Sequence, residues 1–360
     1  MATIVMESIG RVFISLQQIR GVPRMLTEAA PSMPGTVRDT DVPYYFRERY
    51  VCGGYRPLHQ NWRYYFLSLF QRHNETINVW THLLAFVVIL VKLRHLAESV
   101  DFAGDPHSWP LMILVVSSLT YSAFSAAAHL LGGKSELCHY VFYFLDYVGV
   151  AQYQYGSAIV HFYYAVDEGL HGHVRGVFMP AAAVLSCLSC LGCCYGKYCN
   201  HSLPPWVRKV CQVVPSAIAY AWDSSPVAKR IAWWCAAGGG GDGDDDPAIA
   251  FHFGQFGFFL GCSVFFTFPV LERCFPGRCN FVGQSHQMFH VFLSCCTLCQ
   301  IHASHLDYAA RRELYSRLHG SGEAGVFAGL YAATLASCAL IAALMLRRVK
   351  RVLDADAKSK

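Results

Sequence analysis

The sequence predicts an all-α polytopic membrane protein, and its composition and the grouping of its apolar residues lead to this fold class. The 360-residue chain is 54% hydrophobic and only 15% charged, with a mean hydropathy of +0.29. A soluble domain of this size usually carries about 25% charged residues. The apolar residues are gathered in blocks of about 20, the length of helix that crosses a bilayer. A helical hairpin in a soluble enzyme could mimic one such block but not a series of them.

Eight blocks are long enough to be membrane spans. They cover residues 77–95, 109–131, 139–166, 176–195, 209–235, 248–271, 286–305 and 325–346. The third block is long and contains Tyr and Gln, and the fifth is broken by Asp223 and Pro226. We therefore predict an N-terminal segment at 1–76 and a seven-transmembrane-helix core at 77–305. A loop at 306–324, an eighth transmembrane helix at 325–346 and a basic tail at 347–360 complete the expected organisation.

The distribution of Lys and Arg predicts the orientation. Of the 29 Lys and Arg residues, 21 lie in the N-terminal segment, the even-numbered connections and the C-terminal tail. Cytoplasmic loops carry such an excess, so we expect both termini to be cytoplasmic. The basic tail residues could contact a partner, but anionic lipid headgroups are the simpler explanation. We expect no nucleic-acid partner.

The cysteine-rich segment CLSCLGCC at 187–194 allows two interpretations. Its spacing is that of a zinc knuckle, but it also places small residues on one face of a membrane helix. We favour helix packing, because four buried thiolates need a positively charged partner that the segment lacks.

Ionisable residues inside spans are the informative ones, since each costs about 2.5 kcal/mol or more at the bilayer centre. His129 lies near the end of the second span, Asp146 near the start of the third, and His286 and His290 at the start of the seventh. Because successive spans alternate in direction, these ends lie on the same side of the membrane. At a rise of 1.5 Å per residue, all four groups lie within roughly 10 Å of that face.

Three imidazoles at one depth predict a zinc site. Two histidines four residues apart on one helix supply two ligands, and a third comes from another helix. The expected Zn²⁺ ligands are His129, His286 and His290, a set that leaves a fourth position open. Asp146 could bind a water molecule there or act as a base, with Ser125 orienting it by a hydrogen bond. The alternative is that these histidines are hydrogen-bonded core residues, since HxxxH alone occurs often by chance.

Further polar groups lie within the predicted spans. The amides of Gln212 and Gln152 could reach a carbonyl group of a ligand, although packing hydrogen bonds are the simpler role. His82 and the remaining intramembrane histidines have no evident partner set and are expected to be core or interfacial.

Several motifs together resemble one family. They are SxxxH closing the second span, Asp146 in FLDYVGV, HxxxH opening the seventh span, GGYRPLHQNWRYYF at 53–66, HNETINVWTHLL at 73–84 and KSELCHY at 134–140. From about residue 41 to 310 the chain resembles the progestin and adipoQ receptor family, in its membrane progestin receptor branch. The eighth span is consistent with this branch, whereas the glycine- and aspartate-rich loop at 236–247 departs from it.

The resemblance implies a seven-helix core with zinc on the three histidines and with Asp146 and Ser125 beside the metal. It also implies a plasma-membrane receptor that binds a progestin or related steroid and signals through inhibitory heterotrimeric G proteins, with a role in oocyte maturation. The same superfamily includes alkaline ceramidases, and adiponectin receptors hydrolyse ceramide.

Three functions therefore remain open. A steroid receptor needs an apolar cavity between helices, and nothing in the residues themselves selects a steroid over a fatty acyl chain or other membrane lipid. A lipid amide hydrolase would use the zinc site with Asp146 as base. A structural zinc would join the ends of three helices without any chemistry. The chemistry of the site favours the enzyme, whereas the resemblance favours the receptor.

Overall fold

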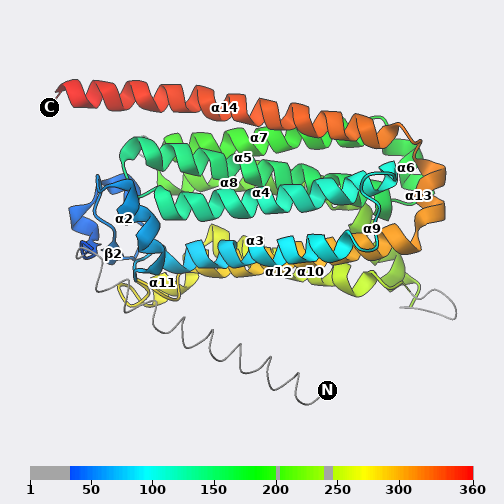
Figure 1. The fold of residues 1–360 in the computed structure, drawn as a ribbon, viewed down its shortest axis with the longest axis horizontal. Helices are drawn as coiled ribbons and strands as arrows, with labels where there is room; N and C mark the ends of the chain where they lie inside the picture. The colour runs from blue at the N-terminus through cyan, green and yellow to red at the C-terminus, as the bar shows by residue number, and fades with distance from the viewer. Residues whose placement is uncertain (1–32, 200–202, 239–245, 360) are drawn as a thin grey trace, which may run out of the picture. The chain divides into compact units, whose positions relative to one another are not determined.

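Long helices lie side by side in the computed structural model, which describes residues 33–199, 203–238 and 246–359 (Figure 1). Residues from Thr36 onward form one compact unit. The part of the predicted 1–76 segment that covers residues 1–32 lies outside the described residues.

Seven helical segments form the core. They are α3 (Thr76–Leu96), α4 (Trp109–Leu131), α5 (Glu136–Val160), α7 (Phe178–Tyr198), α8 (Pro205–Asp223) with α9 (Ser225–Ala236), α10 (Ile249–Thr267) and α12 (Ser285–Ala310). Each of α4, α5, α7 and α8 packs against the helix before it in this series, while α12 packs against α10, α3 and α4. Helix α14 (Glu323–Ser359) lies along α5 and α7 (Figure 1).

Polar side chains are buried inside this bundle and apolar side chains cover its surface. Ser117, Ser118 and Ser122 of α4 are fully buried, whereas Leu84 of α3 is 57% exposed and Leu260 of α10 is 66% exposed. A soluble protein shows the reverse arrangement, since its large apolar side chains are mostly inside. The exposed apolar faces are suited to contact with lipid, and the three serine hydroxyls donate to backbone carbonyls of α4 itself.

Five helices of the described residues are long and apolar enough to cross a membrane. They are Thr76–Leu96, Pro106–Leu131, Phe178–Tyr198, Ile249–Thr267 and Glu323–Lys358. Helices α5 and α12 are as long, with 25 and 26 residues, but their Tyr, Gln and His residues lower the hydropathy. The predicted fifth span is two helices that meet at Ser224, because Pro226 cannot donate a hydrogen bond within a helix. The structure thus supports several spans and leaves the predicted count of seven as a prediction.

Two predicted boundaries need correction. The segment 306–324 was expected to be a loop, but α12 continues to Ala310 and α13 (Arg312–Leu318) follows. The Tyr315 hydroxyl donates a hydrogen bond to the carbonyl of Tyr308, which folds α13 back onto α12. The basic tail at 347–360 continues α14 as helix to Ser359, because Met345 and Val349 still pack in the cluster that includes Tyr140 and Phe144 of α5.

The cysteines of α7 pack against neighbouring helices. Cys190 and Cys194 are buried beside Cys338 of α14 in the same cluster. No metal-binding group of cysteines is present among the described residues. This arrangement agrees with the packing interpretation of CLSCLGCC.

Helices α4 and α5 approach closely because α5 carries glycine where they cross. A Cβ atom on Gly149 would lie 2.9 Å from Cα of Tyr121. A Cβ on Gly156 would lie 2.2 Å from Oγ of Ser117. Only glycine allows this backbone separation, and the separation fixes how far His129 on α4 lies from Asp146 on α5.

A small cap covers the end of the bundle where α4 ends and α12 begins. It contains β1 (Val37–Arg38), antiparallel to β2 (Gly53–Tyr55), and α2 (Trp62–Leu67). Short 3₁₀ turns lie at 39–41, 44–46 and 68–70. Hydrogen bonds join the cap to the segment after α4 and to the segment before α12. His59 N donates to the carbonyl of Lys134, and Cys52 N donates to Oδ1 of Asn280.

The opposite end of the bundle has short connecting helices. A π-helical turn at His161–Ala165 extends α5, and α6 (Glu168–Val174) joins it to α7. Helix α11 (Val270–Cys274) belongs to the capped end, between α10 and α12. Figure 1 shows α6 and α13 at one end and α2 and α11 at the other.

Candidate metal centre

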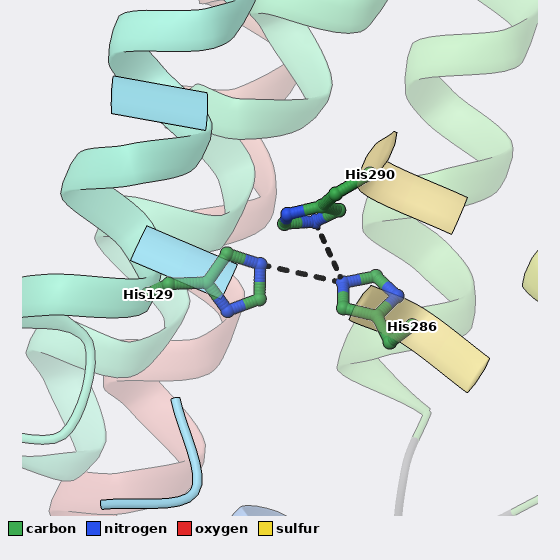
Figure 2. Close-up of side chains that lie close together, drawn as sticks. All are labelled: His129, His286 and His290. Carbon is green, nitrogen blue, oxygen red and sulfur yellow. Dashed lines mark hydrogen bonds between the residues drawn. The ribbon is translucent and has the colours of Figure 1, made fainter. Parts of the chain in front are cut away.

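The three predicted histidines meet at the capped end of the bundle. Nε2 of His286 lies 3.3 Å from Nε2 of His129 and 3.2 Å from Nε2 of His290. Figure 2 shows the three imidazoles directed at a common point between α4 and α12. His129 and His290 are buried, whereas His286 is half-buried.

The protonation of these rings favours a cation at that point. Nδ1 of His129 lies 2.7 Å from Oε2 of Glu75, and Nδ1 of His290 lies 3.2 Å from the carbonyl of Asn78. Both oxygens only accept, so each Nδ1 carries the proton and each Nε2 presents a lone pair. A protonated Nε2 of His286 can donate to only one of these two lone pairs, and an unprotonated one brings three lone pairs together, so no protonation state pairs all three nitrogens.

The spacing fits zinc. Tetrahedral Zn–N bonds of 2.0–2.1 Å place the ligand nitrogens about 3.3–3.4 Å from one another. The two Nε2 separations around His286 agree with this value within about 0.2 Å. Three neutral imidazoles are also the donor set of catalytic zinc sites that keep a fourth position open.

Residues from the start of α3 hold two of the three histidines in place. The Glu75 carboxylate orients His129, and Nδ2 of Asn78 donates to the same Glu75 oxygen at 2.6 Å. Thr81 Oγ1 lies 3.1 Å from Nδ1 of His290. Burial on its own would raise the pKa of Glu75, but the neighbouring His129 and the Asn78 amide outweigh burial and hold this pKa below its usual range. Such carboxylate–histidine contacts are typical around protein-bound zinc.

Glu75 and His82 have no role that the sequence alone predicts. His82 was expected to be core or interfacial without a partner set; it is buried, and its ring stacks on His290 with centroids 3.7 Å apart. The available signal was the stretch HNETINVWTHLL, in which polar residues occupy the first turns of an otherwise apolar helix. In the sequence this stretch is recognisable as a family motif, but it does not show which of its polar residues contact the histidines.

Arg56 of the cap fixes the end of α4. Its guanidinium is buried and donates to the carbonyls of His129 and Leu130 at 2.6 and 2.5 Å and to Oγ of Ser68 at 2.8 Å. The last carbonyls of a helix lack partners within the helix, and a cation there is also favoured by the helix dipole. Arg56 therefore positions His129 through the backbone.

The start of α12 is fixed in a similar way. Gln284 forms a capping box with Gln287, and the Glu272 carboxylate accepts from both the amide and the hydroxyl of Ser285. The residue that follows is the candidate ligand His286. The backbone ahead of both α12 ligands is therefore held by side-chain hydrogen bonds.

Asp146 and Ser125 lie beside the three histidines. The Asp146 carboxylate is close enough to the Ser125 hydroxyl and to His129 to interact with both. Asp146 is not in the tight ligand group, which among the described residues at this end contains the three histidines alone. Gln212 lies on α8, where its side chain faces Gly196 of α7. Its suggested role in ligand binding stays a prediction.

A cavity of about 40 Å³ reaches the centre from the cap side. It is lined by residues of the cap, α4 and α5, among them Arg56, Glu75, His129, His139 and Tyr143. At about 10–15 Å³ per water molecule, it has room for a few waters.

Known proteins resemble this chain over nearly its whole length. Residues 70–301 match the model of the haemolysin-III-related family. The chain is 54% identical to membrane progestin receptor alpha-B of Danio rerio, covering 98% of this chain and 99% of the relative. It is 48% identical to human membrane progestin receptor alpha, covering 98% and 99%. It is 47% identical to human membrane progestin receptor beta, covering 96% and 97%. The chain therefore belongs to the haemolysin-III-related family and, within the progestin and adipoQ receptors, to the membrane progestin receptor branch.

Proposed function

We propose that this chain is a plasma-membrane progestin receptor with a zinc centre at His129, His286 and His290. The observation that carries the receptor role is the near full-length similarity to proteins named membrane progestin receptors. The zinc assignment is supported by the Nε2 separations of 3.2 and 3.3 Å around His286.

The receptor spans the membrane seven times in its core and once more with α14, and both termini are cytoplasmic. Helices α5 and α12 qualify as spans by length, because several of their polar side chains bond to one another inside the bundle and do not face lipid. Nε2 of Gln300 donates to Oγ of Ser157 at 2.6 Å, and the Tyr153 hydroxyl donates to Oε1 of Gln300 at 2.8 Å. The basic end of α14 and the cap lie at the same end of the bundle, which agrees with the excess of Lys and Arg there (Figure 1).

The steroid binds between the helices, where an unpaired amide is available. Gln152 of α5 is fully buried, and neither its oxygen nor its nitrogen has a hydrogen-bond partner among the described residues. A buried amide without partners is unfavourable, and the ketone of a progestin would accept from its nitrogen. Gln152 is six residues beyond Asp146, or roughly 9 Å further along α5. Gln212 is the second candidate for such a contact.

Signalling passes to inhibitory heterotrimeric G proteins on the cytoplasmic side and contributes to oocyte maturation. This part of the proposal rests on the family resemblance alone. The basic turn at Arg347, Arg348, Lys350 and Arg351 is the part of α14 that would meet either anionic lipid headgroups or a protein partner.

The alternative function is hydrolysis of a lipid amide, and the contact between Ser125 and Asp146 favours it. Zinc, when bound, would polarise a carbonyl group and lower the pKa of a water molecule. Asp146 would accept a proton from the attacking water, and Ser125 would orient the Asp146 carboxylate. A purely structural zinc remains the third possibility, in which the metal only joins α4 to α12.

One purified, full-length sample separates these functions. We would measure bound zinc, saturable binding of radiolabelled progesterone and release of fatty acid from ceramide, for the native chain and for Asp146→Asn. A receptor with structural zinc keeps zinc and progesterone binding in the variant, whereas a hydrolase keeps zinc and loses turnover. Zinc-loaded, folded protein that binds no progesterone would overturn the receptor proposal. Folded protein without bound zinc, or a His286→Ala variant that retains all of it, would overturn the zinc assignment.

A further inference from the structure

A second group of potential metal ligands lies at the opposite end of the bundle. His171 belongs to α6, His319 follows α13, and Glu323 is the first residue of α14. One ligand atom from each lies within 4.8 Å of the other two. The helix α4 that runs between the two ends has 23 residues, so the second group is roughly 30 Å from the three-histidine centre.

The two imidazoles are buried and incompletely paired. His171 is 6% exposed and His319 is 2% exposed. Neither Nε2 atom has a hydrogen-bond partner among the described residues. The two rings are nearly perpendicular, with centroids 4.9 Å apart. Two unpaired ring nitrogens in one buried place are unfavourable unless a further group completes them.

Glu323 gives this pair a negative charge and a fixed orientation. Its Oε2 lies 2.7 Å from Nδ1 of His319, so Nδ1 carries the proton and Nε2 of His319 presents a lone pair. A histidine that ligates a metal through one nitrogen commonly donates its other N–H to a carboxylate in this way. A carboxylate that accepts from Nδ1 lies on the side of the His319 ring away from Nε2, so Glu323 would orient the ring for a metal on Nε2 and would not ligate that metal itself.

The surrounding side chains hold the rings in position. The ring of Tyr163 stacks on His319 with centroids 4.1 Å apart, and Phe162 stacks on His171 at 5.5 Å. At the start of α6, the Asp167 carboxylate accepts from the amide of Leu170, which fixes the turn that carries His171. Aromatic packing alone would explain these contacts, but it would not explain why two ring nitrogens and a carboxylate share one buried place.

We propose that a second zinc ion binds to the unpaired Nε2 atoms of His171 and His319, with the Glu323 carboxylate orienting His319 and supplying negative charge nearby. The ion joins α6 to the junction of α13 and α14 and so anchors the beginning of the eighth helix to the core. With the termini cytoplasmic, this site lies at the extracellular end, where zinc from outside the cell can exchange with it. The proposal does not depend on the receptor activity, because the two metal groups share no residue.

Zinc content of the purified full-length protein tests this proposal. The protein would carry an affinity tag without histidine, be incubated with Zn²⁺, dialysed, and analysed for bound metal per chain. We expect two zinc ions in the native chain and one in His171→Gln. His173→Gln is the matched control, since His173 is exposed on the same helix and should leave both ions in place.

Variants of the first site keep the outcome unambiguous. His286→Ala should retain one ion, and combining it with His171→Gln should leave none. If His286→Ala alone removes all bound zinc, or if His171→Gln retains two ions, the second site is refuted. Should His171→Gln fail to fold, visible absorption of Co²⁺ bound to His286→Ala replaces it. A tetrahedral Co²⁺ spectrum supports the site, and its absence refutes it.

Discussion

Replacing Glu75 tests whether the carboxylate–histidine contact supports a metal. Oε2 of Glu75 is 2.7 Å from Nδ1 of His129, and its side chain is 16% exposed. Loss of such a supporting group lowers zinc affinity by about 10–100-fold, which corresponds to about 1.4–2.7 kcal/mol. Glu75→Gln keeps an oxygen acceptor for Nδ1 but loses the charge, so we expect a loss near the lower value. Glu75→Ala removes both and should approach the upper value.

The assay is competition for zinc between the purified protein and a chelator of known affinity. The matched control is Glu98→Gln, because Glu98 is 65% exposed and forms a surface pair with His95. Variants of the second metal group would be measured alongside, so that each affinity is assigned to one site. Equal zinc affinity in Glu75→Ala, Glu98→Gln and the native chain would refute the reasoning, because the contact would then be packing without a metal to support.

Three further predictions concern stability in detergent, measured by thermal melting. Arg56→Ala should destabilise the fold by about 3 kcal/mol, because buried carbonyls and a hydroxyl lose a charged donor. Arg56→Lys should lose less stability, and equal melting temperatures of the native chain and both variants would contradict this prediction. Gly149→Ala should lower the stability of the fold by about 1–3 kcal/mol, since its Cβ would press on the backbone of α4. Gly329 is the control, because a Cβ there has nothing within 4 Å, and Gly329→Ala should stabilise α14 by about 0.5–1 kcal/mol. Burial would raise the pKa of Asp105, but hydrogen bonds from Tyr308 of α12 and Arg312 of α13 hold this pKa below its usual value. The ionised carboxylate therefore stabilises the fold above roughly pH 4, and this stabilisation is lost as the pH falls below that. Asp105→Asn should therefore be less stable than the native chain at pH 7, by less than about 1 kcal/mol because its cationic partner is half exposed. A stability gap that does not shrink as the pH is lowered from 7 toward 3 would refute the assignment.

The long helices could be predicted because their signal is local. The apolar block at 109–131 coincides with α4, Trp109–Leu131, since a run of apolar residues is enough to indicate a helix in lipid. The short helix α13 could not be predicted in this way, because seven residues give no block and its burial depends on Tyr315 meeting Tyr308. The break between α8 and α9 at Ser224 could be predicted from Asp223 and Pro226, which interrupt the apolar block.

The three histidines could be brought together from the sequence because the direction of each span is known from its number. If each intervening span crosses the whole membrane, the helix ends that carry His129, His286 and His290 lie at the same membrane face. Glu75 and Arg56 could not be placed by this argument, because they precede the first span and reach α4 across 54 and 73 residues. Periodicity within a helix holds no information about such contacts, whereas the side-chain hydrogen bonds of the structure give them directly.

The surroundings of the centre differ on its two sides, and this bears on what the metal can do. On the cap side, the cavity of about 40 Å³ admits a few water molecules but has no room for a lipid amide with its chains. Toward the interior, the ring of His82 covers His290. A lipid substrate would therefore have to reach the centre from the helix surface, where His286 and Asp146 are half-buried. A steroid held near Gln152 needs no such approach, because α5 carries both Gln152 and Asp146 and so links the two places. On the proposed function, a metal that fixes α12 against α4 would shape the steroid site without touching the steroid, and by linkage the steroid would tighten metal binding by the same factor that the metal tightens steroid binding.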